Sequence, residues 1–382
     1  MLLHGRRAML LALASGLALP GAAPPARAEA GWPMTVTDSI GRRVTLRAPP
    51  RAILLGTGFH LIALSLLHPD PVSLLAGWPE DLRRYNAPLA DAFAARFPAL
   101  SRVPVVGGAE SGTLSAEQAL SVGADLAIFG GWQAASGSGA ALMRQLAEAG
   151  VPSLVVDFTA DPLANTAPGM RLLGRVLGRA AQGEDFASLH ETRLEAIRRV
   201  VAAHPGPGPG VLLHAFPGAE DCCWVAGTEG IGSLLAAVGG RNLGAGFFPA
   251  GSSGGALSLE ALVTAEPEVY IATGLPRNWR QPGFSIGPGV PAEAARRSLA
   301  RALEGPGLAS LPAVRSGRAH GLWNFFNAVP LNILAVEALA RWVRPELFPD
   351  LDPGATLAEI NRRFAAMPFE GSFWVSLDPA LP

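Results

Sequence analysis

Lysine is missing from the sequence, and all 30 basic residues are arginine. The formal net charge is −1, so there is no excess of positive charge that would indicate a nucleic-acid partner. The only two cysteines, Cys222 and Cys223, are neighbours, and no CxxC or Cys/His spacing accompanies them. Two adjacent thiols alone are therefore a poor signal for a metal site. Because adjacent cysteines close a strained ring, we favour two free thiols over a structural disulfide.

The N-terminus has the pattern of an export signal. Arg6 and Arg7 precede an apolar run over residues 8–19, and Ala26-Arg27-Ala28 is a small-residue cleavage site. The apolar run is too short to span a bilayer as a helix. The arginine pair leaves both general and twin-arginine export open. We expect a mature protein that begins near Glu29 and is soluble outside the cytoplasm.

The rest of the chain alternates short apolar strands with helical patterns. "AILL", "ADLAIFGG" and "VPSLVVDF" each read as a buried strand followed by a turn. Such strands with helices between them predict a parallel sheet covered on both faces. From residue 168 the pattern is helical, with a break expected near Gly183, and it stops at "HPGPGPG". Strands and helices then alternate again.

These patterns predict an α/β protein with two Rossmann-like lobes, each built on a parallel sheet, joined by a long helix. The expected segments are a signal peptide (1–28), an N-terminal lobe (29–167), a linking helical segment (168–204) and a C-terminal lobe (205–382).

One helix-then-strand unit occurs twice. "LSAEQALSVGADLAIFGG" begins at Leu114, and "LSLEALVTAEPEVYIATG" begins at Leu257, so each predicted lobe contains one copy. The serine of each copy is a favourable N-cap, which places Glu117 and Glu260 in an exposed first helical turn. Two α/β lobes that face each other form a cleft at the carboxyl ends of their strands, where ligands usually bind.

Residues that follow the predicted strands are the candidates for lining this cleft. Bulky aromatic side chains with a few polar groups suit a partly apolar organic ligand, and Arg277 suits an anionic one. For any single aromatic, packing in the core is an equally good interpretation. The candidate ligand-binding residues are Phe59, His60, Trp78, Trp132, Phe158, Trp224, Arg277, Asn278, Trp323, Asn324, Phe325, Phe326 and Asn327.

Four stretches in this order carry a family resemblance: "VTDSIGRRVTL", "PPRAILLG", the two "LSxE" units and "GRAHGLWNFFNAVPLNILAVEALARWVRPELFPDLDP". The chain resembles periplasmic substrate-binding proteins of the iron-siderophore and cobalamin ABC-importer class, the class III binding proteins with a helical backbone. The resemblance implies two lobes joined by a single long rigid helix. It also implies a periplasmic, non-catalytic monomer that captures a ferric siderophore or related metal chelate. It also implies delivery to the importer's permease dimer, with Glu117 and Glu260 docking to permease arginines. It implies no cofactor, with metal present only in the bound chelate.

Other interpretations stay open at this point. Cobalamin, haem, a nickel complex or an oxyanion would need only different side chains in the same cleft. Direct metal binding is disfavoured because the histidines are scattered, although His60 follows the first strand as in zinc-binding relatives. A haem-ligating tyrosine would have to be Tyr85 or Tyr270. A periplasmic enzyme or a ligand sensor could use the same fold, but "GTGFHL" lacks the third glycine of a dinucleotide motif at Leu61.

Overall fold

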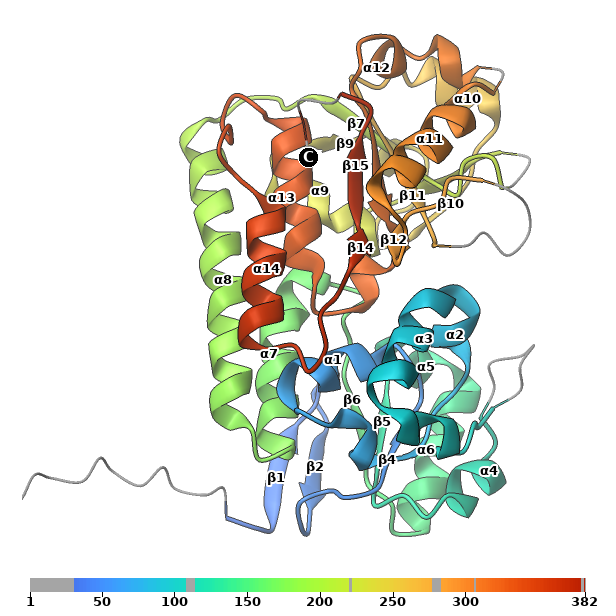
Figure 1. Cartoon of the computed structure of the whole chain (residues 1–382), viewed down its shortest axis with the longest axis vertical. Coiled ribbons are helices and arrows are strands. Elements are labelled where there is room, and N and C mark those ends of the chain that lie inside the picture. Colours follow the sequence, from blue (N-terminus) through green and yellow to red (C-terminus); the bar gives the residue numbers. More distant parts are fainter. Residues whose placement is uncertain are drawn as a thin grey trace, which may run out of the picture.

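Two α/β lobes lie one above the other, and helices α7 (Pro162–Val176) and α8 (Ala180–Ala203) run along one side of the molecule (Figure 1). The computed structural model describes residues 31–107, 114–219, 222–276, 283–305, 307–378 and 381. The expected export signal, Arg277 and Asn278 lie outside these residues. In the part of the chain that is described, no helix combines the length and the apolar character needed to cross a membrane.

The N-terminal lobe contains a sheet of four parallel strands in the order β4-β3-β5-β6. The strands are β3 (Ile53–Leu55), β4 (Leu75–Gly77), β5 (Leu126–Phe129) and β6 (Ser153–Val155). Alternate residues of these strands belong to two different apolar clusters: Leu54 packs into one, whereas Ile53 and Leu55 pack into the other. The continuous apolar runs therefore have the expected cause, a parallel sheet covered on both faces.

Helices cover both faces of this sheet and follow its strands. They are α1 (His60–Leu67), η1 (Pro71–Leu74), α2 (Asp81–Tyr85), α3 (Ala87–Arg96), η2 (Pro98–Arg102), α4 (Ala116–Ser121), α5 (Gly131–Ala135) and α6 (Gly137–Glu148).

A small hairpin, β1 (Met34–Thr37) and β2 (Arg43–Leu46), precedes the first lobe. Asp38 in its turn accepts hydrogen bonds from the backbone N–H of Arg42 at 2.9 Å and of Val155 at 3.2 Å. Arg42 also forms an ion pair with Asp38 at 2.7 Å. One carboxylate thus closes the turn and fastens the hairpin to β6.

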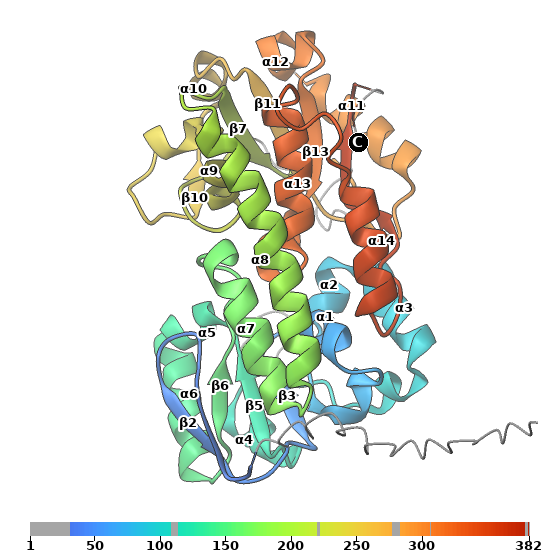
Figure 2. The same cartoon turned by 90° about the vertical axis from the view of Figure 1, so that its left-hand side faces the viewer.

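The linking segment consists of two helices, not one. α7 begins at Pro162, six residues before the expected boundary at 168, and the break falls between Val176 and Ala180. The expected break near Gly183 is wrong, because Gly183 lies inside α8. This glycine serves helix packing instead. A Cβ on Gly183 would lie 2.7 Å from the Met170 carbonyl oxygen, so glycine here allows α7 and α8 to touch. α8 has 24 residues and is about 36 Å long, so it passes beside both lobes (Figure 2).

The C-terminal lobe has a mixed sheet in the order β10-β8-β7-β11-β13-β15, with β9 paired to β7. β7, β9, β11 and β13 pair parallel as expected, whereas β8, β10 and β15 pair antiparallel to their neighbours. The strands are β7 (Gly210–Ala215), β8 (Trp224–Ala226), β9 (Arg241–Asn242), β10 (Gly254–Ala256), β11 (Val269–Gly274), β13 (Ala319–Trp323) and β15 (Trp374–Ser376).

The remaining elements cover this sheet. β12 (Gly287–Pro288) pairs with β14 (Gly371–Ser372) in a separate ribbon. The helices are η3 (Gly230–Ser233), α9 (Leu234–Ala237), η4 (Leu243–Gly246), α10 (Leu259–Thr264), α11 (Ala292–Leu303), η5 (Leu308–Ser310), α12 (Pro312–Arg315), η6 (Asn324–Ala328), α13 (Asn332–Val343) and α14 (Pro353–Arg363).

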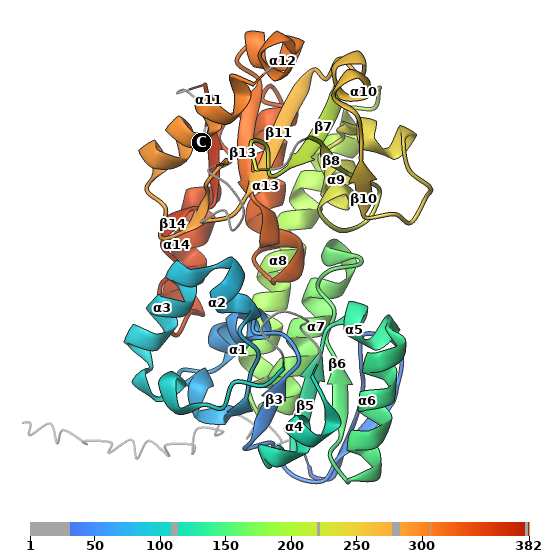
Figure 3. The same ribbon diagram turned by 90° about the vertical axis from the view of Figure 1, so that its right-hand side faces the viewer.

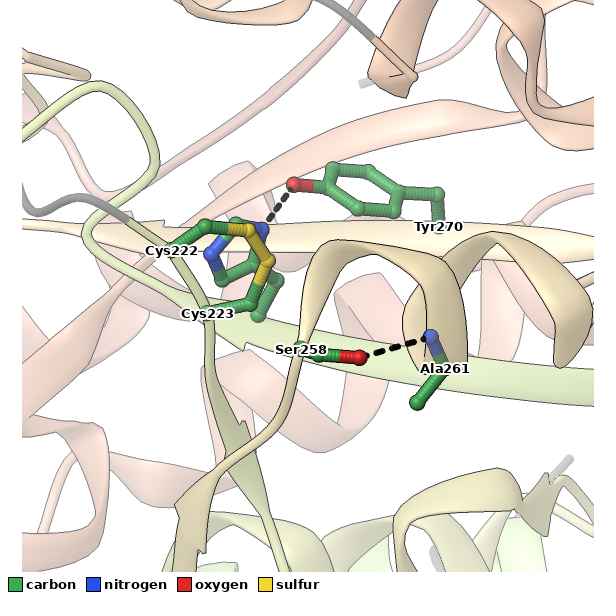
Figure 4. Close-up of a disulfide and its surroundings, with 6 residues drawn as sticks. Cys222, Cys223, Ser258, Ala261 and Tyr270 are labelled. Carbon is green, nitrogen blue, oxygen red and sulfur yellow. Dashed lines mark hydrogen bonds between the residues drawn. A yellow bond between two sulfur atoms is a disulfide. The ribbon is translucent and has the colours of Figure 1, made fainter.

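The repeated unit has the same construction in both lobes. The Ser115 hydroxyl caps α4 by accepting from the Gln118 N–H at 3.2 Å, and Ser258 caps α10 by accepting from the Ala261 N–H at 3.2 Å (Figure 4). Each copy also has an acidic residue just before its strand, Asp125 in the first and Glu268 in the second, and both have the same structural role. The carboxylate accepts backbone N–H groups at the start of a neighbouring strand, those of Arg51 and Ala52 in one lobe and that of Gly210 in the other. In both copies the serine and the acidic residue before the strand therefore stabilise the fold.

The structure joins Cys222 and Cys223 by a disulfide across a cis peptide bond, contrary to the expectation of two free thiols. The two Cα atoms are 3.1 Å apart, and both sulfur atoms lie near His214. No residue pattern around the two cysteines predicts that their side chains turn to the same side.

Candidate functional site

A cavity of about 660 Å³ lies between the two lobes. Figure 3 shows β6 of the lower lobe pointing toward the upper lobe, so the carboxyl ends of the first sheet face the C-terminal lobe. The N-terminal lobe lines the cavity with residues that follow all four of its strands, whereas η6 supplies the residues of the C-terminal lobe. The lining residues are Gly56, Thr57, Phe59, His60, Pro79, Glu80, Asp81, Arg83, Arg84, Tyr85, Val106, Gly107, Gly130, Trp132, Val156, Phe158, Thr159, Asn324, Phe325, Asn327 and Ala328.

An aromatic contact joins the two lobes at this cavity. The ring of Phe59, which follows β3, stacks on the ring of Phe325 in η6, with centroids 4.2 Å apart and planes 17° apart. Tyr85 at the end of α2 approaches the same Phe325 ring at 5.6 Å. The wall is therefore apolar and flat where the two lobes meet, a surface that suits the planar face of an organic ligand.

His60 is a buried histidine of the cavity wall. It is 3% exposed, and its Nε2 lies 3.0 Å from the Val156 carbonyl oxygen. A carbonyl can only accept, so Nε2 carries the proton and Nδ1 is an acceptor. Burial lowers the pKa of His60 to about 4, which keeps the ring neutral near pH 7. Within the described chain, Nδ1 has no hydrogen-bond partner.

Asp81 lies on the cavity wall and is held by hydrogen bonds. Its carboxyl group accepts hydrogen bonds from the Thr57 hydroxyl at 2.6 Å and from the Gly58 N–H at 2.8 Å. Burial outweighs these bonds and raises the pKa of Asp81 above its usual value. A Cβ on Gly58 would lie 2.8 Å from a carboxylate oxygen of Asp81, so glycine is needed at this contact. The carboxyl group therefore fastens the loop after β3 to the start of α2.

Two arginines of α2 supply positive charge. Arg83 forms an ion pair with Asp91 at 2.7 Å and keeps 45% of its side chain exposed. The guanidinium of Arg84 lies over the Tyr85 ring, 5.6 Å from its centroid. Arginine suits carboxylates and the oxygens of chelates because its planar fork can donate two parallel hydrogen bonds.

Seven of the predicted ligand-binding residues lie together on the cavity wall: Phe59, His60, Trp132, Phe158, Asn324, Phe325 and Asn327. Trp224 lines an adjoining hollow of about 240 Å³, which shares Asn324 and Asn327 with the main cavity. Arg277 and Asn278 fall outside the described residues.

The structure places Trp78, Trp323 and Phe326 outside the lining of the cavity. Trp78 is 4% exposed, and the other two are fully buried in the core. The reason for the last two is the geometry of η6. In a 3₁₀ helix, residues three apart share a face. Trp323, which precedes η6, and Phe326 therefore pack together with ring centroids 5.4 Å apart, while Asn324 and Asn327 face the cavity.

Sequence reasoning missed Asp81, Arg83 and Arg84 as cavity residues, and it named Tyr85 only as a candidate haem ligand. They lie in "WPEDLRRY", which directly follows the strand β4. The prediction took only the first residue after that strand, Trp78, which turns into the core. Extending the search through the whole segment after the strand would have included the two arginines.

The two glutamates of the repeated unit lie on the surface, far from the cavity wall. Glu117 and Glu260 are both exposed in the first turn of α4 and α10. Hydrogen bonds from its own backbone N–H and from Ser258 lower the pKa of Glu260, so it is ionised at neutral pH. Figure 1 shows α4 and α10 on the side of the molecule opposite α8, one on each lobe.

Neither a protein-family model nor a curated protein sequence matches the chain. Solved structures do match. A TroA-like periplasmic binding protein, FepB from Veillonella parvula, superposes with a TM-score of 0.81 at 22% identity, over 91% of this chain and 100% of that chain. CeuE from Helicobacter pylori, in a Ni-His complex, gives a TM-score of 0.62 at 15% identity, over 87% and 95%. A periplasmic haem-binding protein, RhuT from Roseiflexus sp. RS-1, gives 0.54 at 22% identity, over 78% and 99%.

The chain therefore has the two-lobed fold of the TroA-like periplasmic binding proteins. The α/β class, the two lobes and the helical link agree with the fold that the sequence predicts.

Proposed function

We propose that this protein is an exported solute-binding protein that captures a metal chelate between its lobes and delivers it to an ABC importer. The observation that carries the proposal is the interlobe cavity of about 660 Å³ with its wall of aromatic rings. Its volume falls in the range of about 300–1,000 Å³ that is usual for sites of small organic ligands. The two-lobed fold supports a capture role, because the wall of the cavity is divided between the two lobes.

Two arginines of the wall suit an anionic chelate, and we infer a ferric siderophore or a related complex. Arg83 and Arg84 can pair with carboxylate or phenolate oxygens of such a ligand. The Phe59–Phe325 stack and the exposed ring of Trp132 suit its apolar parts. A bare oxyanion would fill little of this volume and would leave the aromatic wall unused.

Haem is a second candidate because of one observation. Tyr85 and His60, whose side-chain types both serve as axial haem ligands, line the same cavity. Haemin would give a Soret band whose position changes on coordination by tyrosine. Loss of that change in Tyr85→Phe, with unchanged binding of ferric chelates, would separate the two candidates.

Delivery to the importer is proposed to use Glu117 and Glu260. Each lobe presents one exposed acid in the first turn of a capped helix, on the side away from α8. A two-fold permease offers two equivalent positive sites, which this pair of acids can meet.

The test is a titration of the mature protein with ferric hydroxamate, catecholate and citrate complexes, cobalamin, haemin, nickel-histidine and molybdate. Trp132 is 58% exposed on the cavity wall, so its fluorescence should be quenched by a bound chelate. Trp132→Phe should lose most of the quenching, while calorimetry still detects binding. Saturable binding of one ferric chelate at micromolar concentration or below supports the proposal. Binding of no chelate in calorimetry would contradict it.

A further inference from the structure

A cluster of three potential metal ligands lies outside the interlobe cavity. The ligand atoms of His214, Cys222 and Cys223 all lie within 4.8 Å of one another. His214 is near the end of β7, and the cysteines immediately precede β8, which pairs with β7. Ligand atoms around a tetrahedral zinc ion lie roughly 3–4 Å apart, so little movement separates this cluster from a binding geometry.

A hydrogen bond already orients the histidine of this cluster. Nδ1 of His214 lies 2.6 Å from the hydroxyl oxygen of Tyr270 on the neighbouring strand β11 (Figure 4). In the tautomer that donates from Nδ1, the other nitrogen, Nε2, keeps a lone pair for a metal. Histidines that bind metals almost always have such a partner on the second ring nitrogen, because it fixes the tautomer and the ring orientation.

The surroundings bury most of the cluster and leave a route to the sulfurs. His214 is 3% exposed. Cys223 is 1% exposed, whereas Cys222 is only half-buried and lies nearer to solvent. A soluble reductant or metal ion would therefore reach the cluster through Cys222.

We propose that His214, Cys222 and Cys223 form a redox-gated site for a thiophilic divalent cation of the Zn²⁺ type. In the oxidised state the two sulfurs are bonded to each other and the site is closed. A dithiol reductant supplies two electrons and two protons, which break the S–S bond and leave two thiols, and the reductant becomes a disulfide. The cation then replaces the two thiol protons and is bound by two thiolates and Nε2, with a water molecule as the fourth ligand.

Thiolate and imidazole together favour Zn²⁺-type ions over Mg²⁺ or Ca²⁺, which prefer oxygen ligands. The site is independent of the proposed transport function because none of its three residues lines the interlobe cavity. It lies close to that region in the chain, since Ala215 and Trp224, the residues after His214 and Cys223, line the adjoining 240 Å³ hollow.

Cobalt provides a direct test, because Co²⁺ bound to thiolate has a charge-transfer absorption band. The chain has only two cysteines, so this band can report on no other site. The full mature protein, reduced and kept without oxygen, is titrated with Co²⁺, and Zn²⁺ is then added as a competitor. We expect saturation at one Co²⁺ per chain, displacement by Zn²⁺, and no band in the oxidised protein. Absence of the band in the reduced protein would overturn the proposal.

Variants distinguish the three-ligand site from binding by the thiols alone. Cys222→Ser and Cys223→Ser should each abolish saturable binding, and Tyr270→Phe should weaken it by about 10–100-fold while keeping all three ligands. His214→Gln should also lose the high-affinity band, whereas His204→Gln, a change of an exposed histidine, should not. Wild-type affinity in both His214→Gln and Tyr270→Phe would overturn the assignment of His214. Tyr270→Phe covers the case in which the His214 variant fails to fold.

Discussion

The indole N–H of Trp323 donates a hydrogen bond of 2.9 Å to the side-chain oxygen of Asn86, a residue 237 positions earlier in the chain. Both side chains are fully buried, and they come from different lobes. This bond lies beside the Phe59–Phe325 stack, since Trp323 directly precedes η6. A polar contact and an aromatic contact together hold the two lobes at one separation.

Removing one partner of this bond should destabilise the protein. Asn86→Ala leaves the Trp323 N–H buried and unpaired, and Trp323→Phe leaves the Asn86 oxygen unpaired. We expect each to lower the free energy of unfolding by about 1–3 kcal/mol, with additional loss for the smaller ring. Chemical denaturation of both single variants and the double variant measures the coupling between them. Strictly additive effects would show that the bond contributes nothing between the lobes.

Phe325 and Phe326 are neighbours in sequence, but their substitutions should have different effects. Phe325→Ala removes the C-terminal half of the aromatic contact on the cavity wall, so the affinity for the bound chelate should fall roughly tenfold, about 1.4 kcal/mol. Phe326→Ala empties a buried position and should cost about 3–5 kcal/mol of stability. Calorimetric titration and thermal unfolding of each variant check this. Equal effects on affinity would mean that η6 does not present alternate faces to ligand and core.

Charge reversal at the two exposed glutamates should separate binding from transport. Glu117→Arg combined with Glu260→Arg should leave ligand affinity unchanged and abolish uptake in cells that depend on this protein. The matched control is Asp185→Arg with Glu195→Arg, because it reverses two exposed acids on α8, on the opposite side of the molecule. Normal uptake by the glutamate variant would contradict the docking role.

Buried histidines should make the protein less stable as the pH falls below about 6.5. Burial lowers the pKa of His60 and His214 to about 4 and that of His320 to about 3. Between pH 6.5 and these values the unfolded chain takes up protons that the folded chain does not. Each histidine therefore removes up to about 1.4 kcal/mol of stability per pH unit.

The measurement is the free energy of unfolding between pH 7 and pH 5 for the wild type and for His60→Gln and His320→Gln. Each variant should show a shallower dependence on pH. The comparison uses variants because the raised pKa values of Asp81 and Glu337 act in the opposite direction on the total slope. A slope unchanged in both variants would contradict the assignment.

The parts of the fold that were predicted correctly depend on local sequence patterns. Ser115 and Ser258 act as helix caps as expected, because capping depends only on residues within one turn. The buried strands of the first lobe were predictable because both faces of a parallel sheet require apolar residues. The sequence analysis predicted a helix break near Gly183, but this glycine allows α8 to pack closely against α7. That contact involves a residue on another helix, so the local sequence does not indicate it.

The candidate site was predictable only in part, for a related reason. The strand-end rule placed Phe59, His60 and Trp132 on the cavity wall, but it could not tell which faces of η6 point inward. A hydrophobic pattern of three residues such as Trp323, Phe325 and Phe326 fits several backbone geometries, and only the 3₁₀ turn separates core from cavity. The Cys222–Cys223 bond likewise depends on a local backbone geometry that composition does not encode.

The division of the cavity wall between the lobes has a kinetic consequence. The N-terminal lobe presents residues after four strands, and the C-terminal lobe adds the short segment η6. We infer that a ligand first meets the N-terminal lobe and is then retained by η6. Association rates should follow substitutions such as those at Arg83 and Trp132, whereas residence times should follow those at Phe325 and Asn327. Stopped-flow measurements in which Phe325→Ala altered only the association rate would contradict this order of events.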